Sequence, residues 1–363
     1  MTDATRSVLE GAESAALAEQ FHGADGRAVR PCTPADVTRR HLRMLDVRPG
    51  ARVLDIGAGS GLSAALLARL AGPEGQVTAV EIDAGLAGRA EGLYRAHGHR
   101  VAVVVGDGRL GHPPGAPYDR ILAGTTPPAV PDAWLRQLAP GGVLLSGVRI
   151  SDLPFGYAIA RITVDERHRP HEVEVHHGGY MPMAGPERPD DVTHAADPER
   201  PERSVTLLGT HDPRVADSFL TALTGARHIE PSPAMEGDWY HLKNWLMAVE
   251  PDGLLEATLD RGNGIGIGVR GAGHPLAGHP MNASPDPDSP PERGSWTVGD
   301  RSAHAALVTG LHLVADHSGS PALARLRALI DRWRADGAPR TDRLRAELRP
   351  DGDVWHVRIT ARA

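Results

Sequence analysis

The order of apolar and polar residues divides the chain into short segments of two kinds. Between about residues 50 and 150, runs rich in β-branched residues alternate with runs in which apolar residues recur at helical spacing. Strands and helices that alternate in this way form a parallel, doubly wound sheet with right-handed crossovers. Two further strand-like runs predict an antiparallel pair at one edge of that sheet. The predicted strands begin at Val53 and then cover residues 76–82, 100–105, 118–123, 143–148, 157–164 and 171–180, and the predicted helices cover residues 7–21, 34–45, 62–70, 84–97 and 131–138.

The pattern changes at residues 184–203, which contain four prolines, many charges and hardly any large apolar residue. This composition is typical of a linker. Five of the six tryptophans follow it, so the C-terminal part can build its own core. We predict a first domain over residues 1–185, a linker over residues 186–205 and a second, α+β domain over residues 206–363. In the second domain we expect helices over residues 213–223, 303–315 and 321–335, strands over residues 245–249, 254–259 and 265–269, a loop over residues 271–294 and a hairpin over residues 343–360.

The run from Val53 to Gly61, V-L-D-I-G-A-G-S-G, is an apolar strand that turns through three alternate glycines into a helix. Such a turn directs backbone N–H groups toward one point, which suits an anionic ligand. A dinucleotide-binding turn has the spacing G-x-G-x-x-G, whereas Leu62 follows G-x-G-x-G here. The spacing therefore favours S-adenosylmethionine (SAM) over NAD. Gly57 and Gly59 would let the backbone approach the methionine part, whose carboxylate would lie near the helix N-terminus.

Acidic residues lie at the ends of three successive strands. Asp55 precedes the turn and could orient the loop or receive the methionine ammonium, and Glu81 could accept hydrogen bonds from both ribose hydroxyls. Asp107, between two glycines, could accept from the adenine amino group. The residues predicted to bind the cofactor are Asp55, Gly57, Ala58, Gly59, Ser60, Gly61, Glu81, Ile82, Asp107 and Gly108.

Composition and charge exclude several classes of protein. The formal net charge of −7 argues against a general nucleic-acid or membrane-surface binder, because phosphate binding needs a basic field. Cys32 is the only cysteine, so neither an intrachain disulfide nor a cysteine metal cluster can form. There is no apolar signal segment or membrane-length apolar run, and we expect a cytoplasmic protein. The histidines of residues 168–177 alternate like a strand and project to both faces, so we predict no metal site.

Two further runs resemble a known family. Residues 106–122 read G-D-G-R-L-G-H-P-P-G-A-P-Y-D-R-I-L, and residues 130–142 read V-P-D-A-W-L-R-Q-L-A-P-G-G. With the glycine turn and Y-M-P-M at residues 180–183, they resemble the protein-L-isoaspartate O-methyltransferases over residues 30–185. The resemblance implies SAM-dependent methylation of a side-chain carboxylate, with S-adenosylhomocysteine as the product. A carboxylate is ionised at pH 7, so this reaction needs alignment and removal of water rather than a general base.

The family has an S-x-P segment whose serine lies beside the transferred methyl group. The matching stretch here is Pro31-Cys32-Thr33-Pro34, in which Cys32 takes the serine position and Thr33 keeps a hydroxyl nearby. Cys32 equally fits a small buried structural residue. Two threonines after the fourth strand lie on the expected substrate side, although plain loop positions suit them equally. The predicted catalytic residues are Cys32, Thr33, Thr125 and Thr126.

The sequence allows more than one substrate. The resemblance ends before the second domain, which suits one dedicated partner, and family-like enzymes with a C-terminal extension methylate an ordinary aspartate of a ribosomally made peptide. We predict this reaction, in which the next backbone nitrogen attacks the ester to give an aspartimide and then isoaspartate. General repair of isoaspartyl proteins is the alternative, and a SAM-binding scaffold is an alternative of another class. The predicted partner is a peptide or protein bearing Asp or isoAsp, and the sequence indicates no oligomeric state.

Overall fold

The computed structural model describes residues 8–10, 12–183, 192–209, 211–234, 237–250, 253–270, 274–275 and 303–361. The chain forms two compact units, which are described one at a time. The first combines Met1–Ile150, Tyr157–Gly185 and Arg345–Arg358, and the second combines Ser151–Gly156, Pro186–Leu344 and Ile359–Ala363. Among the described helices, none is long and apolar enough to span a membrane.

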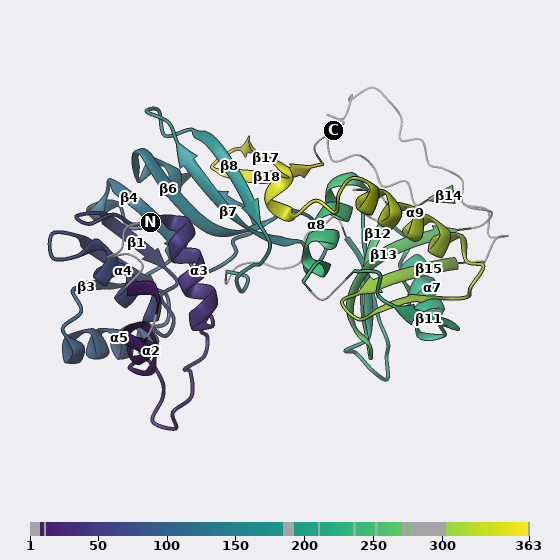
Figure 1. The fold of residues 1–363 in the computed structure, drawn as a ribbon, viewed down its shortest axis with the longest axis horizontal. Coiled ribbons are helices and arrows are strands. Elements are labelled where there is room, and N and C mark those ends of the chain that lie inside the picture. The colour runs from purple at the N-terminus through teal and green to yellow at the C-terminus, as the bar shows by residue number, and fades with distance from the viewer. Residues whose placement is uncertain are drawn as a thin grey trace. The chain divides into compact units, whose positions relative to one another are not determined.

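A seven-stranded sheet forms the centre of the first unit (Figure 1). Its order is β3-β2-β1-β4-β6-β7-β8. The first five strands run parallel to one another, β7 pairs antiparallel with β6, and β8 pairs antiparallel with β7. The chain leaves β1 toward β2 and β3 and then returns to β4 on the other side, so the strand order reverses between β1 and β4. The predicted doubly wound sheet with an antiparallel edge is confirmed. The strands are β1 (Arg52–Ile56), β2 (Gln76–Glu81), β3 (Val101–Val105), β4 (Tyr118–Ala123), β6 (Leu138–Arg149), β7 (Tyr157–Val164) and β8 (Pro170–His176).

The helices of this unit begin where capping and apolar residues favour them. Asp83 starts α5 because its Oδ1 accepts hydrogen bonds from two backbone N–H groups of the first turn, at 2.8 and 2.9 Å. The apolar residues of α4 join one core cluster with β1, β2 and α3. The helix predicted over residues 131–138 is shorter, because Leu138 pairs with Tyr118 and begins β6. The helices are α2 (Ala12–Glu19), α3 (Ala35–Leu45), α4 (Leu62–Ala71), α5 (Ala84–His97) and α6 (Asp132–Arg136), with short 3-10 helices η1 (Gly108–Leu110) and η2 (Pro113–Gly115).

The C-terminal hairpin belongs mainly to the first unit. The strands β17 (Arg345–Asp351) and β18 (Val354–Thr360) form a small sheet with β5 (Val130–Pro131). The indole Nε1 of Trp355 donates to Asp132 Oδ1 at 2.9 Å, and the backbone N–H of Asp132 donates to the carbonyl of Asp353 at the same distance. The boundary predicted for residues 206–363 is therefore corrected, because pairing with β5 joins the end of the chain to the first unit.

A second, antiparallel sheet forms the centre of the other unit. Its order is β11-β16-β15-β13-β12-β10-β9, with β14 paired to β13. Alternate residues of its strands pack with α7 on one face, whereas α9 contacts β13 and β15 and also touches α8 (Figure 1). The predicted α+β class of this unit is confirmed. Its elements are β9 (Val192–Ala196), β10 (Ser204–Leu208), α7 (Pro213–Thr224), β11 (His228–Pro231), α8 (Trp239–Val249), β12 (Leu254–Leu259), β13 (Gly262–Arg270), β14 (His274–Pro275), β15 (Ala303–Thr309), β16 (His312–Ala315), α9 (Pro321–Ala335) and the 3-10 helix η3 (Thr341–Arg343).

Three of the predictions for this unit are wrong. The strand expected at residues 245–249 is the second half of α8, whose buried apolar residues recur at helical spacing. The helix expected at residues 303–315 is the β15–β16 hairpin, because pairing with β13 outweighs the helical propensity of an alanine-rich run. The expected linker contains β9, which pairs with β10. Residues 184–191 of that linker, and all of the predicted 271–294 loop except β14, lie outside the described residues.

Candidate active site

The site lies at the carboxyl ends of β1, β2 and β4, where the strand order reverses. The backbone N–H of Gly57 donates to the carbonyl of Val80, and that of Gly124 donates to the carbonyl of Ile56, each at 2.8 Å. These two bonds hold the glycine turn between the neighbouring strand ends. A crevice at such a reversal is the usual ligand site of an open α/β sheet.

The glycines of the turn have backbone conformations and neighbours that exclude side chains. Gly57, Gly59 and Gly61 have φ angles of +75°, +50° and +96°. A Cβ on Gly57 would lie 2.8 Å from Thr125 Cγ2, and one on Gly59 would lie 2.8 Å from the carbonyl oxygen of Pro31. The turn therefore needs glycine both for its positive φ angles and for close packing. Gly61 precedes α4 without a side-chain cap within the described chain, so the first helix N–H groups remain available to an anionic ligand. Binding of such a ligand stays a prediction.

Glu81 holds the glycine turn from the end of β2. Its Oε2 accepts from the backbone N–H of Gly59 at 2.8 Å, and its Oε1 accepts from that of Asp83 at 3.1 Å. The residue is only 7% exposed, yet each carboxylate oxygen retains a lone pair for another donor. The adjacent Ile82 is 62% exposed and presents an apolar side chain at the same edge. This arrangement suits a ligand with both hydroxyl groups and an apolar ring.

Asp55 lies in β1, two residues before the glycine turn, and is fully buried. Its Oδ2 accepts from the hydroxyl of Ser63 at 2.6 Å, whereas Oδ1 is buried without a hydrogen-bond partner among the described residues. Burial raises the pKa of the Asp55 carboxyl to about 7, the Ser63 hydrogen bond opposes this shift, and the charge of Glu81 adds to it. An unsatisfied buried carboxyl oxygen is stabilised by a cationic donor. Ser63 is not among the predicted site residues, because its only signal in the sequence is a hydroxyl in the first turn of α4.

The side chain of Asp107 forms hydrogen bonds and an ion pair with Arg109 of the same loop. Its Oδ1 accepts from the backbone N–H of Arg109 at 3.0 Å, and its Oδ2 lies 2.7 Å from the Arg109 guanidinium. The hydrogen bonds from Arg109 lower the pKa of Asp107. A Cβ on Gly108 would lie 2.5 Å from Ile56 Cγ2, so a glycine is needed where this loop crosses the end of β1. The loop thus lies at the predicted edge, and contact of Asp107 with an adenine stays a prediction.

The Pro31–Pro34 stretch lies against the glycine turn. The carbonyl of Pro31 approaches Gly59, and both Cys32 and Thr33 are half-buried. The hydroxyl of Thr38 donates to the carbonyl of Pro34 at 3.1 Å, which ties the stretch to the first turn of α3. Two segments remote in sequence therefore meet at one edge of the site, and the catalytic role of Cys32 and Thr33 stays a prediction.

Thr125 and Thr126 have different environments. The methyl group of Thr125 packs over Gly57, and its Oγ1 is buried without a hydrogen-bond partner in the part of the chain that the structure describes. The hydroxyl of Thr126 donates to the carbonyl of Tyr180 at 2.9 Å and accepts from the Tyr180 backbone N–H at 3.2 Å. Its own N–H donates to the carbonyl of Met181 at 2.8 Å. Thr126 thus anchors the 180–183 segment, whereas Thr125 keeps an unpartnered hydroxyl within the described chain. The catalytic role of both threonines stays a prediction.

A pair of polar side chains that was not among the predicted site residues, His41 and Tyr180, lies at the start of the 180–183 segment. The ring of His41 on α3 hydrogen-bonds through Nδ1 to the Tyr180 hydroxyl at 2.6 Å, and Arg40 Nη2 lies 3.2 Å from Nε2. Arginine only donates, so Nε2 accepts and the proton of the neutral ring lies on Nδ1. Burial, followed by the charge of Arg40, lowers the pKa of His41 to about 4. The Tyr180 hydroxyl accepts from His41 and keeps its own proton, and burial raises its pKa with the charge of Asp55 adding to the shift.

The chain is similar in sequence to known proteins over this region. Residues 33–158 match the family model "Protein-L-isoaspartate(D-aspartate) O-methyltransferase (PCMT)". A protein-L-isoaspartate O-methyltransferase of Ignicoccus hospitalis is 41% identical over 32% of this chain and 61% of its own length. One from Methanopyrus kandleri is 48% identical over 28% of this chain and 46% of its own length. A solved structure of the same designation covers 98% of this chain and 94% of its own at 14% identity, with a TM-score of 0.41.

The family-model match has defined bounds. It includes the glycine turn, Glu81 and Asp107, and it ends at residue 158, before the sheet of the second unit begins at β9. The chain spans between 46% and 61% of the length of the two relatives named above. The family model and these relatives support a relation of the first unit, over residues 33–158, to the protein-L-isoaspartate O-methyltransferase family.

Proposed function

We propose that this chain is a SAM-dependent carboxyl O-methyltransferase that acts on isoaspartyl residues of peptides or proteins. The observation that carries the proposal is the position of the buried Asp55. Its Oδ1 is buried without a hydrogen-bond partner in the described chain, and Asp55 lies two residues before Gly57 of the turn that the family match includes. A glycine turn that admits no side chain, with one buried acceptor just before it, suits a ligand bearing both a carboxylate and an ammonium group.

The remaining predicted residues fit the parts of SAM. Asp55 Oδ1 would accept from the ammonium, the N–H groups at the start of α4 would bind the carboxylate, and Glu81 would accept from the ribose hydroxyls. Ile82 and the Asp107 loop would contact the adenine. When bound, SAM would supply an electrophilic methyl group on its sulfonium sulfur.

The chain's own groups would align the substrate rather than activate it. A substrate carboxylate is ionised near neutral pH, so no base has to remove a proton. The unpartnered Oγ1 of Thr125, again within the described chain, is a donor at the edge of the glycine turn. Cys32 and Thr33 would lie on the opposite side of the site, because the contact between Pro31 and Gly59 holds their segment against the glycine turn. Alignment by such groups and removal of water from the carboxylate are the contributions that this reaction requires.

The test is methyl transfer by the full chain. A peptide with one isoaspartyl residue is incubated with SAM, and mass spectrometry should detect a methyl ester and S-adenosylhomocysteine. The same peptide with its isoaspartate replaced by asparagine is the matched control and should stay unmodified. SAM binding by calorimetry without methylation of any carboxyl substrate would favour the scaffold alternative, and the absence of binding of both SAM and S-adenosylhomocysteine would reject the cofactor site.

A narrower substrate is our second candidate, namely an ordinary aspartate of one dedicated, ribosomally made peptide. The second unit has a core of its own outside the matched residues, which supports this candidate. The sequence resemblance also places Cys32 at the serine position of the family. The aspartyl methyl ester would be attacked by the next backbone nitrogen. This attack forms the C–N bond of an aspartimide and expels methanol, and water can then open the ring to isoaspartate.

The two substrates can be separated in one competition experiment. Equal amounts of an isoaspartyl peptide and of a precursor peptide encoded beside this chain's gene are offered with limiting SAM. Preferential methylation of an aspartate in the precursor, followed by loss of methanol, would support the dedicated reaction. Methylation of the isoaspartyl peptide alone would contradict it and leave general repair.

A further inference from the structure

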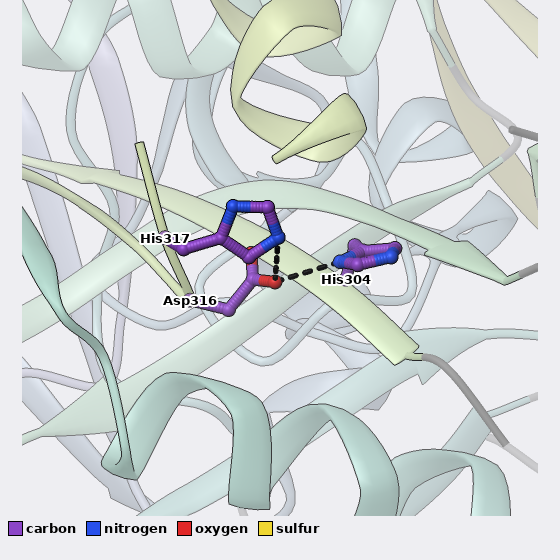
Figure 2. A group of neighbouring side chains, drawn as sticks. All are labelled: His304, Asp316 and His317. Carbon is purple, nitrogen blue, oxygen red and sulfur yellow. Dashed lines mark hydrogen bonds and ion pairs between the residues drawn. The ribbon is translucent and has the colours of Figure 1, made fainter. Parts of the chain in front are cut away.

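Three metal-ligating side chains meet at one corner of the second unit. His304 lies near the start of β15, and Asp316 and His317 directly follow β16. Figure 2 shows one carboxylate oxygen of Asp316 facing both rings. That oxygen, Oδ2, lies 2.7 Å from His304 Nδ1 and 3.4 Å from His317 Nε2. One potential ligand atom from each residue lies within 4.8 Å of the other two.

The carboxylate of Asp316 is poorly satisfied for its degree of burial. Its side chain is 13% exposed, and Oδ1 is buried with no hydrogen-bond partner in the described part of the chain. The two histidines interact with Oδ2 alone. A buried carboxylate oxygen without a partner is costly, and a metal ion that binds the carboxylate would neutralise its charge. The side chain of His317 is 47% exposed, so solvent can reach this corner of the unit.

We propose that His304, Asp316 and His317 bind a divalent transition metal, Zn²⁺ in the first instance, with water in the remaining coordination position. Two imidazoles and one carboxylate are a ligand set that suits Zn²⁺ and related first-row ions. With bonds of about 2.0–2.1 Å, neighbouring ligands of a tetrahedral Zn²⁺ lie about 3.4 Å apart. The distance from His317 Nε2 to Asp316 Oδ2 already has this value, and the distance from His304 Nδ1 to the same oxygen has to increase by about 0.7 Å.

Binding has one identifiable cost within the loop. The backbone N–H of Gly319 donates to His317 Nδ1 at 3.1 Å, so the proton of the neutral ring lies on Nε2 in the metal-free chain. Coordination through Nε2 moves the ring proton to Nδ1, and the Gly319 N–H then has to turn to water. This bond joins exposed groups, so hydrogen bonds to water largely offset its loss. Such a cost is small beside the affinity of a three-ligand zinc site.

The pairing of β15 with β16 brings the proposed ligands together. The β15–β16 pairing brings Ala306 opposite Ala315, so His304 and Asp316 lie side by side although twelve positions separate them in the sequence. The metal would then link the start of β15 to the turn before α9. The three-ligand set with an open position also leaves room for a carboxylate or amide oxygen of another molecule.

The test uses the full chain after treatment with a chelator. Calorimetric titration with Zn²⁺ should give one site with a dissociation constant of about 1 μM or lower, and Co²⁺ should give visible absorption bands of a site with nitrogen ligands. His304→Ala, Asp316→Asn and His317→Ala should each weaken Zn²⁺ binding on the order of 100-fold and abolish the Co²⁺ bands.

A matched control removes a histidine that is also paired with a carboxylate in the same sheet. His228 Nε2 lies 3.1 Å from Glu230 Oε2 on β11, and His228→Ala should leave the high-affinity site intact. Circular dichroism of each variant checks that it is folded. Zn²⁺ binding that is equally weak in the wild type and in the triple variant, or that falls as much with His228→Ala, would overturn the proposal. The outcome is independent of methyl transfer by the first unit.

Discussion

The two sides of the active-site edge are built in different ways. The cofactor side consists of one contiguous turn, Gly57–Gly61, held by Glu81 and preceded by Asp55. The proposed substrate side consists of separate segments: the Pro31–Pro34 stretch against Gly59, Thr125 against Gly57, and the 180–183 segment that Thr126 anchors. A contiguous turn is specified by its own backbone conformation, whereas an edge assembled from separate segments depends on the packing that joins them. Substitutions on the two sides should therefore have different kinds of effect.

The largest effect is expected on the cofactor side. Gly59→Ala places a methyl group 2.8 Å from the Pro31 carbonyl and strains a residue with φ +50°, so SAM binding should weaken on the order of 100-fold. Calorimetric titration with SAM measures the change. Gly72→Ala is the matched control, because Gly72 has φ +68° and no atom within 4 Å of its Cβ position among the described residues. An equal loss of SAM affinity in both variants would mean that strain at a positive φ angle, rather than contact with Pro31, weakens SAM binding.

The next effect separates the two adjacent threonines. Thr126→Val removes two hydrogen bonds to Tyr180 and leaves the backbone N–H and carbonyl of that residue without these partners, so the free energy of unfolding should fall by about 1–3 kcal/mol. Thr125→Val loses no hydrogen bond within the described chain and should change that free energy by less than about 0.5 kcal/mol. Urea unfolding measures both. Thr125→Val should instead lower kcat/KM for the peptide about tenfold, since the substrate loses a neutral hydrogen bond.

A smaller effect is the pH dependence of SAM binding. Burial raises the pKa of Asp55 to about 7, so the carboxyl of the ligand-free protein is protonated below that pH. The SAM ammonium requires the ionised form, and affinity should rise by at most about tenfold per unit between pH 5 and pH 7. Asp55→Asn should bind SAM more weakly and without this slope. A wild-type affinity that is constant over this range would contradict the assigned role of Asp55.

The same carboxyl also affects stability. Between pH 4 and about 7 the folded protein binds the proton of Asp55 that the unfolded chain has released, so this residue's contribution to stability falls as pH rises through that window. His41 acts in the opposite direction, because its pKa is lowered to about 4 and the unfolded chain binds its proton up to about pH 6.5. The Asp55→Asn variant should therefore gain stability with pH more steeply than the wild type between pH 4 and pH 6.5.

The smallest effect is expected at the serine position of the family. Cys32→Ser exchanges a half-buried thiol for a hydroxyl of similar size, and the free energy of unfolding should change by less than about 0.5 kcal/mol. If the substrate is held here, kcat/KM should change about three-fold while SAM affinity stays constant, as expected for a group that acts on the peptide. An equal change in SAM affinity would instead assign Cys32 to the cofactor side.

The order of elements in the first unit was predictable because each strand and helix has a clear period. Residues 84–97, 118–123 and 157–164 were predicted with their observed bounds. The second unit was harder for a physical reason. The alanine-rich run at residues 303–315 has no strong intrinsic preference for a strand, and its pairing with β13 decides its structure. Such non-local pairing leaves no local signal in the chain.

The sequence by itself determined the glycine turn, the acids at or near the ends of three successive strands, and the doubly wound order of the first sheet. These features are local, because glycine conformation, hydrophobic period and strand-end acids are fixed within a few residues. Only the tertiary structure decided that Thr126 is a backbone anchor, that His41 and Tyr180 share a buried hydrogen bond, and that the last hairpin joins the first unit. It also brought His304 beside Asp316. Each of these contacts joins side chains or strands that are remote in sequence, and only packing of the folded chain determines which of them meet.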